Sequence, residues 1–167
     1  MEPDSESTAG SPVEPLPEPP NGMYNARVDD KGRLKLPVGF QQYFSGLPEK
    51  KLFVTSLDRH IGQIYPIRVW RENKDFLYEY RDNPKAAKRV SFNAQDLGAD
   101  SEMDSQGRIL LPPEMRRELG IENQNVRLFA YKGRIQIMSE AIYEDQKRQA
   151  AASAEDDLET LEGAGLL

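Results

Sequence analysis

The sequence lacks cysteine altogether and contains a single histidine, His60. Without cysteine the chain can form no disulfide and has no thiol for catalysis or metal binding, which fits a cytoplasmic location. His60 lies between Arg59 and Ile61 in a predicted turn, the setting of a surface side chain rather than of a general base. The sequence also has no Gly-x-Ser-x-Gly elbow, glycine-rich phosphate loop or His/Cys metal spacing, so we expect no enzyme activity, cofactor, metal or small-molecule substrate.

Long apolar runs are missing, and basic residues are missing from the N-terminus. No stretch approaches the roughly 18 consecutive apolar residues of a membrane span, so we expect no membrane contact. Residues 1–22 carry no Lys or Arg but hold six of the 12 prolines and five acids. Because such a composition buries little apolar surface, we predict a disordered Pro/Glu-rich leader over residues 1–21. The leader has neither the basic nor the apolar region of a secretory signal.

Acidic residues gather at both ends of the chain and conceal a basic centre. The whole chain carries a net charge of −6. Residues 1–22 contribute −5, and residues 144–167, with seven acids against Lys147 and Arg148, contribute another −5. Residues 23–143 therefore carry +4. The acidic total does not argue against nucleic-acid binding, because binding depends on where the basic groups cluster.

A ten-residue pattern occurs twice, as VDDKGRLKLP at residues 28–37 and as MDSQGRILLP at residues 103–112, 75 positions later. Across the aligned windows 29–40 and 104–115, five of 12 positions are identical: Asp, Gly, Arg, Leu and Pro. Asp suits the first position of a type I turn and Gly a position of positive φ, so each copy predicts a tight hairpin. The proline fits the first turn of a helix.

The elements predicted after each hairpin also repeat. Strands are predicted over residues 24–28, 33–36, 51–57, 61–65, 101–104, 108–111, 126–131 and 134–138. Helices are predicted from Pro37, Pro66, Pro112 and Ser139. We predict one repeat over residues 22–68, a helical linker over 69–98, a second repeat over 99–142, and a helix end with an acidic, solvated tail over 143–167. Repeats of this size are marginal alone, so the two should share one core, and open strand edges favour self-association.

The stretch QGRILLPPEMRRELGI resembles the AbrB-type swapped-hairpin DNA-binding half-domain. Two such units in one chain, the first beginning Asp-x-Lys-Gly-Arg-Leu, resemble the MraZ family of bacterial transcriptional regulators. The resemblance implies an α+β fold in which two tandem hairpin/short-helix repeats pack as a pseudo-twofold β-barrel-like core with flanking helices. It implies a nucleoid-associated repressor that binds double-stranded DNA, at direct repeats upstream of its own cell-division and cell-wall operon, as a ring-like homo-oligomer.

The repeated motif supplies the candidate site. Arg33 and Arg108 leave tight turns, and a guanidinium on a rigid rim suits bidentate contact with phosphate or guanine. The further residues expected to contact DNA surround these two arginines: Lys31, Arg27, Lys35 and Gln106. The residues expected to orient the motif are its acids and glycines: Asp29, Asp104, Gly32 and Gly107. A carboxylate repels phosphate, so the acids should hold the arginines rather than touch DNA.

Two other functions remain open from the sequence. The motif arginines could pair only with their neighbouring acids, in an oligomeric scaffold without a DNA ligand. An AbrB-like antitoxin would bind DNA with one end and a toxin with its tail, although that class needs only one repeat and an apolar C-terminal segment. Arg116 and Arg117, adjacent on an amphipathic helix, are interpreted as a solvated face.

Overall fold

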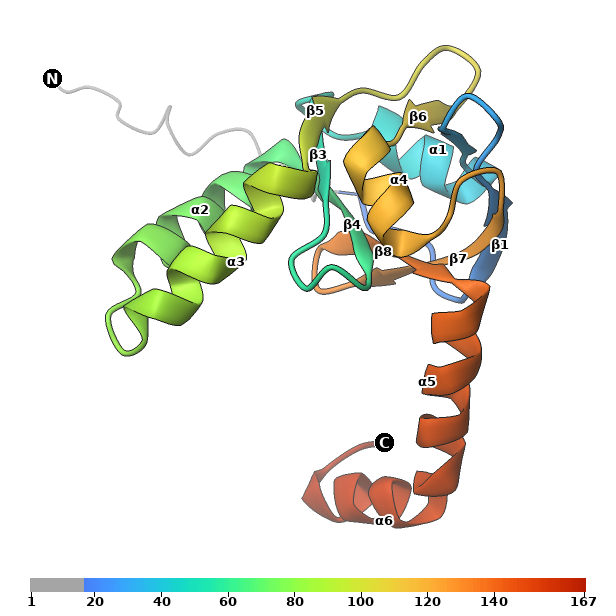
Figure 1. Ribbon diagram of the computed structural model, residues 1–167. Helices are drawn as coiled ribbons and strands as arrows, with labels where there is room; N and C mark the ends of the chain where they lie inside the picture. Colours follow the sequence, from blue (N-terminus) through green and yellow to red (C-terminus); the bar gives the residue numbers. More distant parts are fainter. Residues whose placement is uncertain (1–16) are drawn as a thin grey trace, which may run out of the picture.

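The computed structural model describes residues 17–167, so the first 16 residues of the predicted leader lie outside the described residues. The strands are β1 Tyr24–Arg27, β2 Arg33–Lys35, β3 Leu52–Thr55, β4 Gly62–Pro66, β5 Ala99–Ser101, β6 Arg108–Leu110, β7 Asn125–Tyr131 and β8 Arg134–Ser139. The helices are α1 Val38–Ser45, α2 Ile67–Glu79, α3 Pro84–Leu97, α4 Pro113–Leu119, α5 Glu140–Ala152 and α6 Ala154–Ala164. The fold is α+β, as the resemblance implies, with α2–α3 and α5–α6 flanking the strands (Figure 1).

All strand pairs are antiparallel, and the two repeats exchange strands. A six-stranded sheet has the order β1-β7-β8-β4-β3-β5, and β2 and β6 form a separate two-stranded sheet. The first strand of each repeat therefore pairs with the other repeat, β1 with β7 and β5 with β3. The strand after each motif turn pairs across the repeats, β2 with β6.

The prediction that the strands on either side of each motif turn pair as a hairpin is therefore wrong, although both turns are present. Before and after the first turn the strands share only the isolated bridge between Val28 and Leu34. The strand predicted before the second turn, over residues 101–104, instead spans Ala99–Ser101, and it joins the large sheet as β5. Pairing β2 with β6 sets Leu34 opposite Ile109, and both are fully buried. Three-residue strands gain this burial from the exchange, which a separate short hairpin does not provide.

The strand registers reveal a local twofold relation between the repeats. Leu34 faces Ile109, its own counterpart 75 positions later, in the small sheet. In the large sheet Gln63 faces Gln136, its counterpart 73 positions later. In each case a residue meets its equivalent, which is what a twofold axis between the copies requires. The main core lies between the sheets and is closed by α1 and α4, with Phe40 and Met115 among its fully buried residues.

A second, smaller core lies between the sheet and the α2–α3 pair. Every residue of β3 and β4 is buried, because one face of these strands packs in the main core and the other meets the helices. Trp70 of α2 stacks on Phe53 with ring centroids 4.6 Å apart and is tilted against Tyr65 at 5.3 Å. These aromatic groups are core residues rather than surfaces for stacking nucleic-acid bases.

The acidic C-terminal tail is helical, and residues 150–167 are exposed throughout. Helices α5 and α6 extend from the end of β8, meet at Ser153, and have no buried residue (Figure 1). Three acids occupy the first turn of α6, where a negative charge stabilises the helix dipole: Glu155, Asp156 and Asp157. Counting all the helices of residues 17–167, none is long and apolar enough to cross a lipid bilayer.

Candidate nucleic-acid interface

The first motif turn is held by the side chain of Asp29. One carboxylate oxygen accepts the backbone N–H groups of Lys31 and Arg33, each at 2.9 Å, and the other accepts Nε of Arg33 at 2.9 Å. The turn is closed by the N–H of Gly32, which donates to the Asp29 carbonyl at 3.0 Å. Gly32 has a φ of +80°, a conformation that other residues adopt at a cost. The Asp and Gly of the motif are therefore both required by the turn.

The second turn reproduces this geometry. Asp104 accepts the N–H groups of Gln106 and Arg108 at 2.9 Å and Nε of Arg108 at 2.9 Å. Gly107 donates to the Asp104 carbonyl at 3.0 Å and has a φ of +77°. Asp104 thus contacts its turn and its arginine in the same way as Asp29 does.

Each acid leaves part of its arginine free. The guanidinium contacts Asp29 or Asp104 through Nε, and among residues 17–167 neither Arg33 nor Arg108 uses a terminal nitrogen in a hydrogen bond. The two arginine side chains are 31% and 25% exposed, and the contact between Nε and the acid restricts the movement of each guanidinium. Hydrogen bonds from the arginine amides, the largest cause, lower the pKa of both carboxyls below its ordinary value. The acids therefore stay charged and hold the arginines at neutral pH.

The β2–β6 pairing brings both arginines to one face. Because side chains alternate along a strand, Arg33 and Lys35 share the face opposite to buried Leu34. Lys35 is directly opposite Arg108, and Arg33 is directly opposite exposed Leu110. We call these four residues, Arg33, Lys35, Arg108 and Leu110, the ribbon face. It carries three positive charges on a ribbon of two short strands.

The other predicted contacts fall in different places. Lys31 and Gln106 occupy equivalent, exposed positions in the two turns, next to the ribbon face. The ammonium group of Lys35 donates to the carbonyl of Gln106 and so links the two turns. Arg27 is held elsewhere: its terminal nitrogens bond to Asn123 at 3.0 Å and to Asn125 at 3.2 Å, on and before β7.

Two positioning residues were missed in the sequence. A Cβ atom at Gly32 would lie 2.2 Å from the guanidinium of Arg116, and one at Gly107 would lie 2.2 Å from the amide of Gln41. Gln41 and Arg116 are themselves equivalent, 75 positions apart, so each covers the turn of the other repeat. The interpretation of Arg116 as solvated is wrong, because its side chain is only 14% exposed, whereas Arg117 is 61% exposed. Alignment of the repeats at this offset is the signal that could have found the pair.

Within residues 17–167, no group of three or more His, Asp or Glu side chains is arranged to hold a metal ion. His60 is exposed in the turn between β3 and β4. Its neighbour Arg59 joins that turn to two helices, with ion pairs of 2.6 Å to Asp96 and 2.7 Å to Glu118. This network supports the packing of α3 against α4.

Comparisons with known proteins agree with this geometry. The family described as "MraZ protein, putative antitoxin-like" matches residues 98–163. A protein of Desulfitobacterium hafniense named transcriptional regulator MraZ is 31% identical over 146 residues, which cover 87% of this chain and 98% of the relative. A relative of the same name in Herpetosiphon aurantiacus is 37% identical over 63% of this chain and 71% of the relative. Another, in Acidobacterium capsulatum, is 29% identical over 81% of this chain and 92% of the relative. The chain therefore belongs to the MraZ family.

Proposed function

We propose that this protein is a sequence-specific DNA-binding transcriptional regulator, and that it represses its own cell-division and cell-wall operon by binding direct repeats upstream of it. The observation that carries the proposal is the ribbon face, on which two acid-held arginines with free terminal nitrogens lie on paired strands. The name of the relatives, transcriptional regulator, supports the same function. A regulator of this kind acts in the cytoplasm, at the nucleoid.

The geometry suits the major groove of DNA. The groove is about 12 Å wide and admits a two-stranded β-ribbon, and an arginine there can donate two parallel hydrogen bonds to O6 and N7 of guanine. Arg33 and Arg108 each have two terminal nitrogens for that purpose, because their acids use only Nε. Lys31 and Lys35 supply positive charge at the same turns, for contacts with phosphate that add affinity but no sequence information.

A ring-like homo-oligomer is part of the proposal. β1 and β5 are the edge strands of the large sheet, and an open edge can pair with another copy. The α2–α3 pair exposes three large aromatic side chains, Phe76, Tyr78 and Phe92, and exposed apolar groups of this kind are typical of protein interfaces. An assembly would present several ribbon faces to DNA that contains several repeats, and so raise the overall affinity.

The decisive experiment measures binding to the DNA upstream of the gene. We expect Arg33→Ala and Arg108→Ala each to weaken binding by about 5- to 150-fold, the equivalent of about 1–3 kcal/mol for a bidentate contact. Arg71→Ala is the matched control, since Arg71 is an exposed arginine on α2 that pairs with Glu49 at 2.8 Å. The mass of the assembly should be unchanged in all three variants. Equal affinity for scrambled repeats would exclude the sequence-specific regulator, and loss of assembly in the motif variants would favour the scaffold.

A second candidate function, an antitoxin, is favoured by one observation. Leu158 and Leu161 lie one turn apart on α6 and are about half exposed, so the C-terminal helix carries an apolar stripe that a toxin could cover. The description of the matching family as antitoxin-like points the same way. Co-purification of a small protein that is lost on Leu158→Ser and Leu161→Ser, with DNA binding retained, would support this function.

A further inference from the structure

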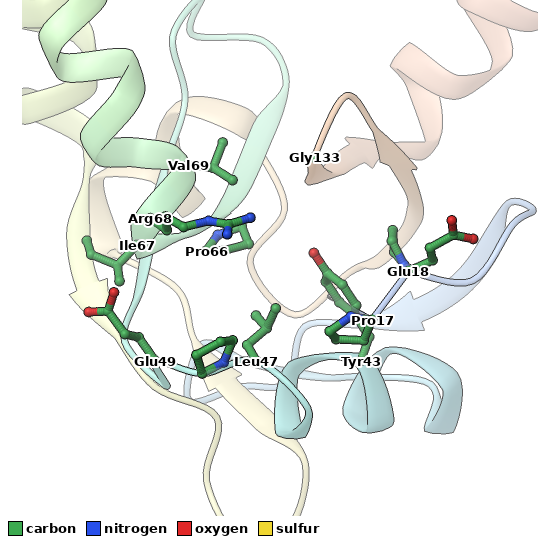
Figure 2. A pocket seen from close by; sticks show the side chains of 12 residues that line it. Pro17, Glu18, Tyr43, Leu47, Glu49, Pro66, Ile67, Arg68, Val69 and Gly133 are labelled. Atoms are coloured by element: carbon green, nitrogen blue, oxygen red, sulfur yellow. The ribbon is translucent and has the colours of Figure 1, made fainter. Parts of the chain in front are cut away.

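A pocket of about 300 Å³ lies between the C-terminal end of α1 and the start of α2, and no residue of the ribbon face lines it. Its walls are mainly apolar and come from separate segments of the chain: Pro17, Pro19, Tyr43, Leu47, Ile67 and Val69. Figure 2 shows Pro17 and Tyr43 on one side of the pocket, with Pro66, Arg68 and Val69 across from them. Concave apolar walls with a few polar groups are typical of sites for small molecules.

Two polar side chains without a partner reach into this apolar space. Tyr43 is only 7% exposed, and among residues 17–167 its hydroxyl makes no hydrogen bond. The Arg68 guanidinium is exposed at the rim and makes no ion pair with any residue of 17–167. Figure 2 shows both groups extending into the space between the two walls. Because polar groups on buried side chains are ordinarily hydrogen-bonded, this arrangement indicates a ligand that accepts hydrogen bonds.

The electrostatics of the pocket favour a negatively charged acceptor. Burial raises the pKa of the Tyr43 hydroxyl, against the opposing effect of the nearby Arg68 charge, so the hydroxyl stays protonated and able to donate. The first turn of α2 holds no acid and Pro66 provides no side-chain cap, which leaves the positive end of the helix dipole uncompensated. Of the two acids that line the pocket, Glu49 is paired with Arg71, and Figure 2 shows the exposed Glu18 carboxylate turned away from the Tyr43 hydroxyl.

We propose that this pocket binds a small carboxylate with an unbranched apolar chain. The carboxylate accepts hydrogen bonds from Arg68 and Tyr43, and its single charge matches the one unpaired arginine at the rim. The chain lies against Leu47, Ile67 and Val69. A cavity of about 150 Å³ holds benzene, so about 300 Å³ accommodates about 12 non-hydrogen atoms, which corresponds to a chain of about eight to ten carbons. The assignment is independent of the proposed function, because it involves no residue expected to contact DNA.

Calorimetric titration and methyl NMR of the full chain, with octanoate and decanoate as probes, test the assignment. We expect saturable binding that shifts the methyl signals of Leu47 and Val69. Acetate, which has the charge but no chain, should not bind measurably. The neutral 1-octanol should bind about fivefold more weakly than octanoate, the effect of losing an exposed ion pair.

Variants of the two polar groups test how the carboxylate is held. Arg68→Gln and Tyr43→Phe should each weaken octanoate binding by about fivefold, since each removes one contact with the carboxylate. Tyr43→Phe keeps the ring and therefore the wall of the pocket. The matched control is Arg81→Gln, which removes the same charge from an exposed arginine beyond the other end of α2 and should leave binding unchanged.

Four results would overturn the proposal. In the first, neither octanoate nor decanoate binds. In the second, they bind but the methyl signals of Leu47 and Val69 do not move, which would place the ligand elsewhere. In the third, 1-octanol binds as tightly as octanoate, or the two variants bind like Arg81→Gln, so that the carboxylate makes no specific contact. In the fourth, nuclear Overhauser contacts without added ligand place another segment or a second copy of the chain against Val69, which would make the occupant protein.

Discussion

Replacement of Gly107 by alanine should destabilise the protein through two separable effects. The backbone φ of +77° costs a residue with a Cβ atom about 1–2 kcal/mol. The new methyl group would also lie 2.2 Å from Cδ of Gln41, so that side chain must move away. In moving it loses its 2.7 Å hydrogen bond to the Leu36 carbonyl, worth about 1 kcal/mol. We expect the free energy of unfolding to fall by about 2–3 kcal/mol and Tm by roughly 6–9 °C.

Gly120 provides the matched control. It has a φ of +65°, but an added Cβ there meets no atom within 4 Å. Gly120→Ala should therefore show only the backbone cost, about 1–2 kcal/mol. The double variant Gly107→Ala, Gln41→Ala removes the close contact, so the two substitutions should be less damaging together than their sum predicts. Thermal unfolding followed by circular dichroism measures the wild type, the double variant and the single variants Gly107→Ala, Gln41→Ala and Gly120→Ala. If Gly107→Ala costs no more than Gly120→Ala, or if the two substitutions simply add, the close packing of Gln41 over the turn is refuted.

Three further predictions concern the motif arginines, the motif acids and Gly98. Arg33→Lys and Arg108→Lys keep the charge but lose the bidentate fork, so DNA affinity should fall nearly as far as with alanine while the salt dependence stays unchanged; retained affinity would indicate phosphate contact instead. The lowered pKa values of Asp29 and Asp104 stabilise the fold above the ordinary value of 3.8, and this stabilisation is lost as pH falls through the folded pKa. Urea unfolding at several pH values between about pH 5 and about pH 3 should show a falling free energy of unfolding. The double variant Asp29→Asn, Asp104→Asn should show a smaller dependence of that free energy on pH, and an equal dependence would contradict the prediction. Gly98→Ala would set a methyl group 2.4 Å from the carbonyl oxygen of Ala94 and should lower the free energy of unfolding by about 1–3 kcal/mol, as measured by urea titration.

Local features of the motif could be predicted from the sequence because their causes are local. Asp29 and Gly32 satisfy the turn within five residues, and Pro37 immediately precedes α1, so the pattern carries its own explanation. The duplication follows from the same comparison, and the register of Gln63 opposite Gln136 agrees with it.

The exchange of strands could not be predicted in the same way. The alternation of Arg33, Leu34 and Lys35 fits a hairpin within one repeat as well as a ribbon between repeats, since either pairing places Leu34 on the face opposite to the two basic side chains. The choice depends on Ile109, which lies 75 positions away. Arg116 was misjudged for a related reason: a charged residue on a helix is ordinarily solvated, and only the fold places this one beneath the turn of the other repeat.

The helices that follow the two equivalent strands differ, and this limits how copies of the chain can meet. β4 leads into the α2–α3 pair, which packs on the sheet, whereas β8 leads into α5 and α6, which bury no residue. A dimer of identical halves would offer the same flank twice, and contacts through these flanks would be isologous. Because the halves are joined in one chain, their flanks have been free to diverge. Copies that associate through one flank of each kind meet head to tail, the arrangement that closes into a ring when the rotation between neighbours divides a full turn.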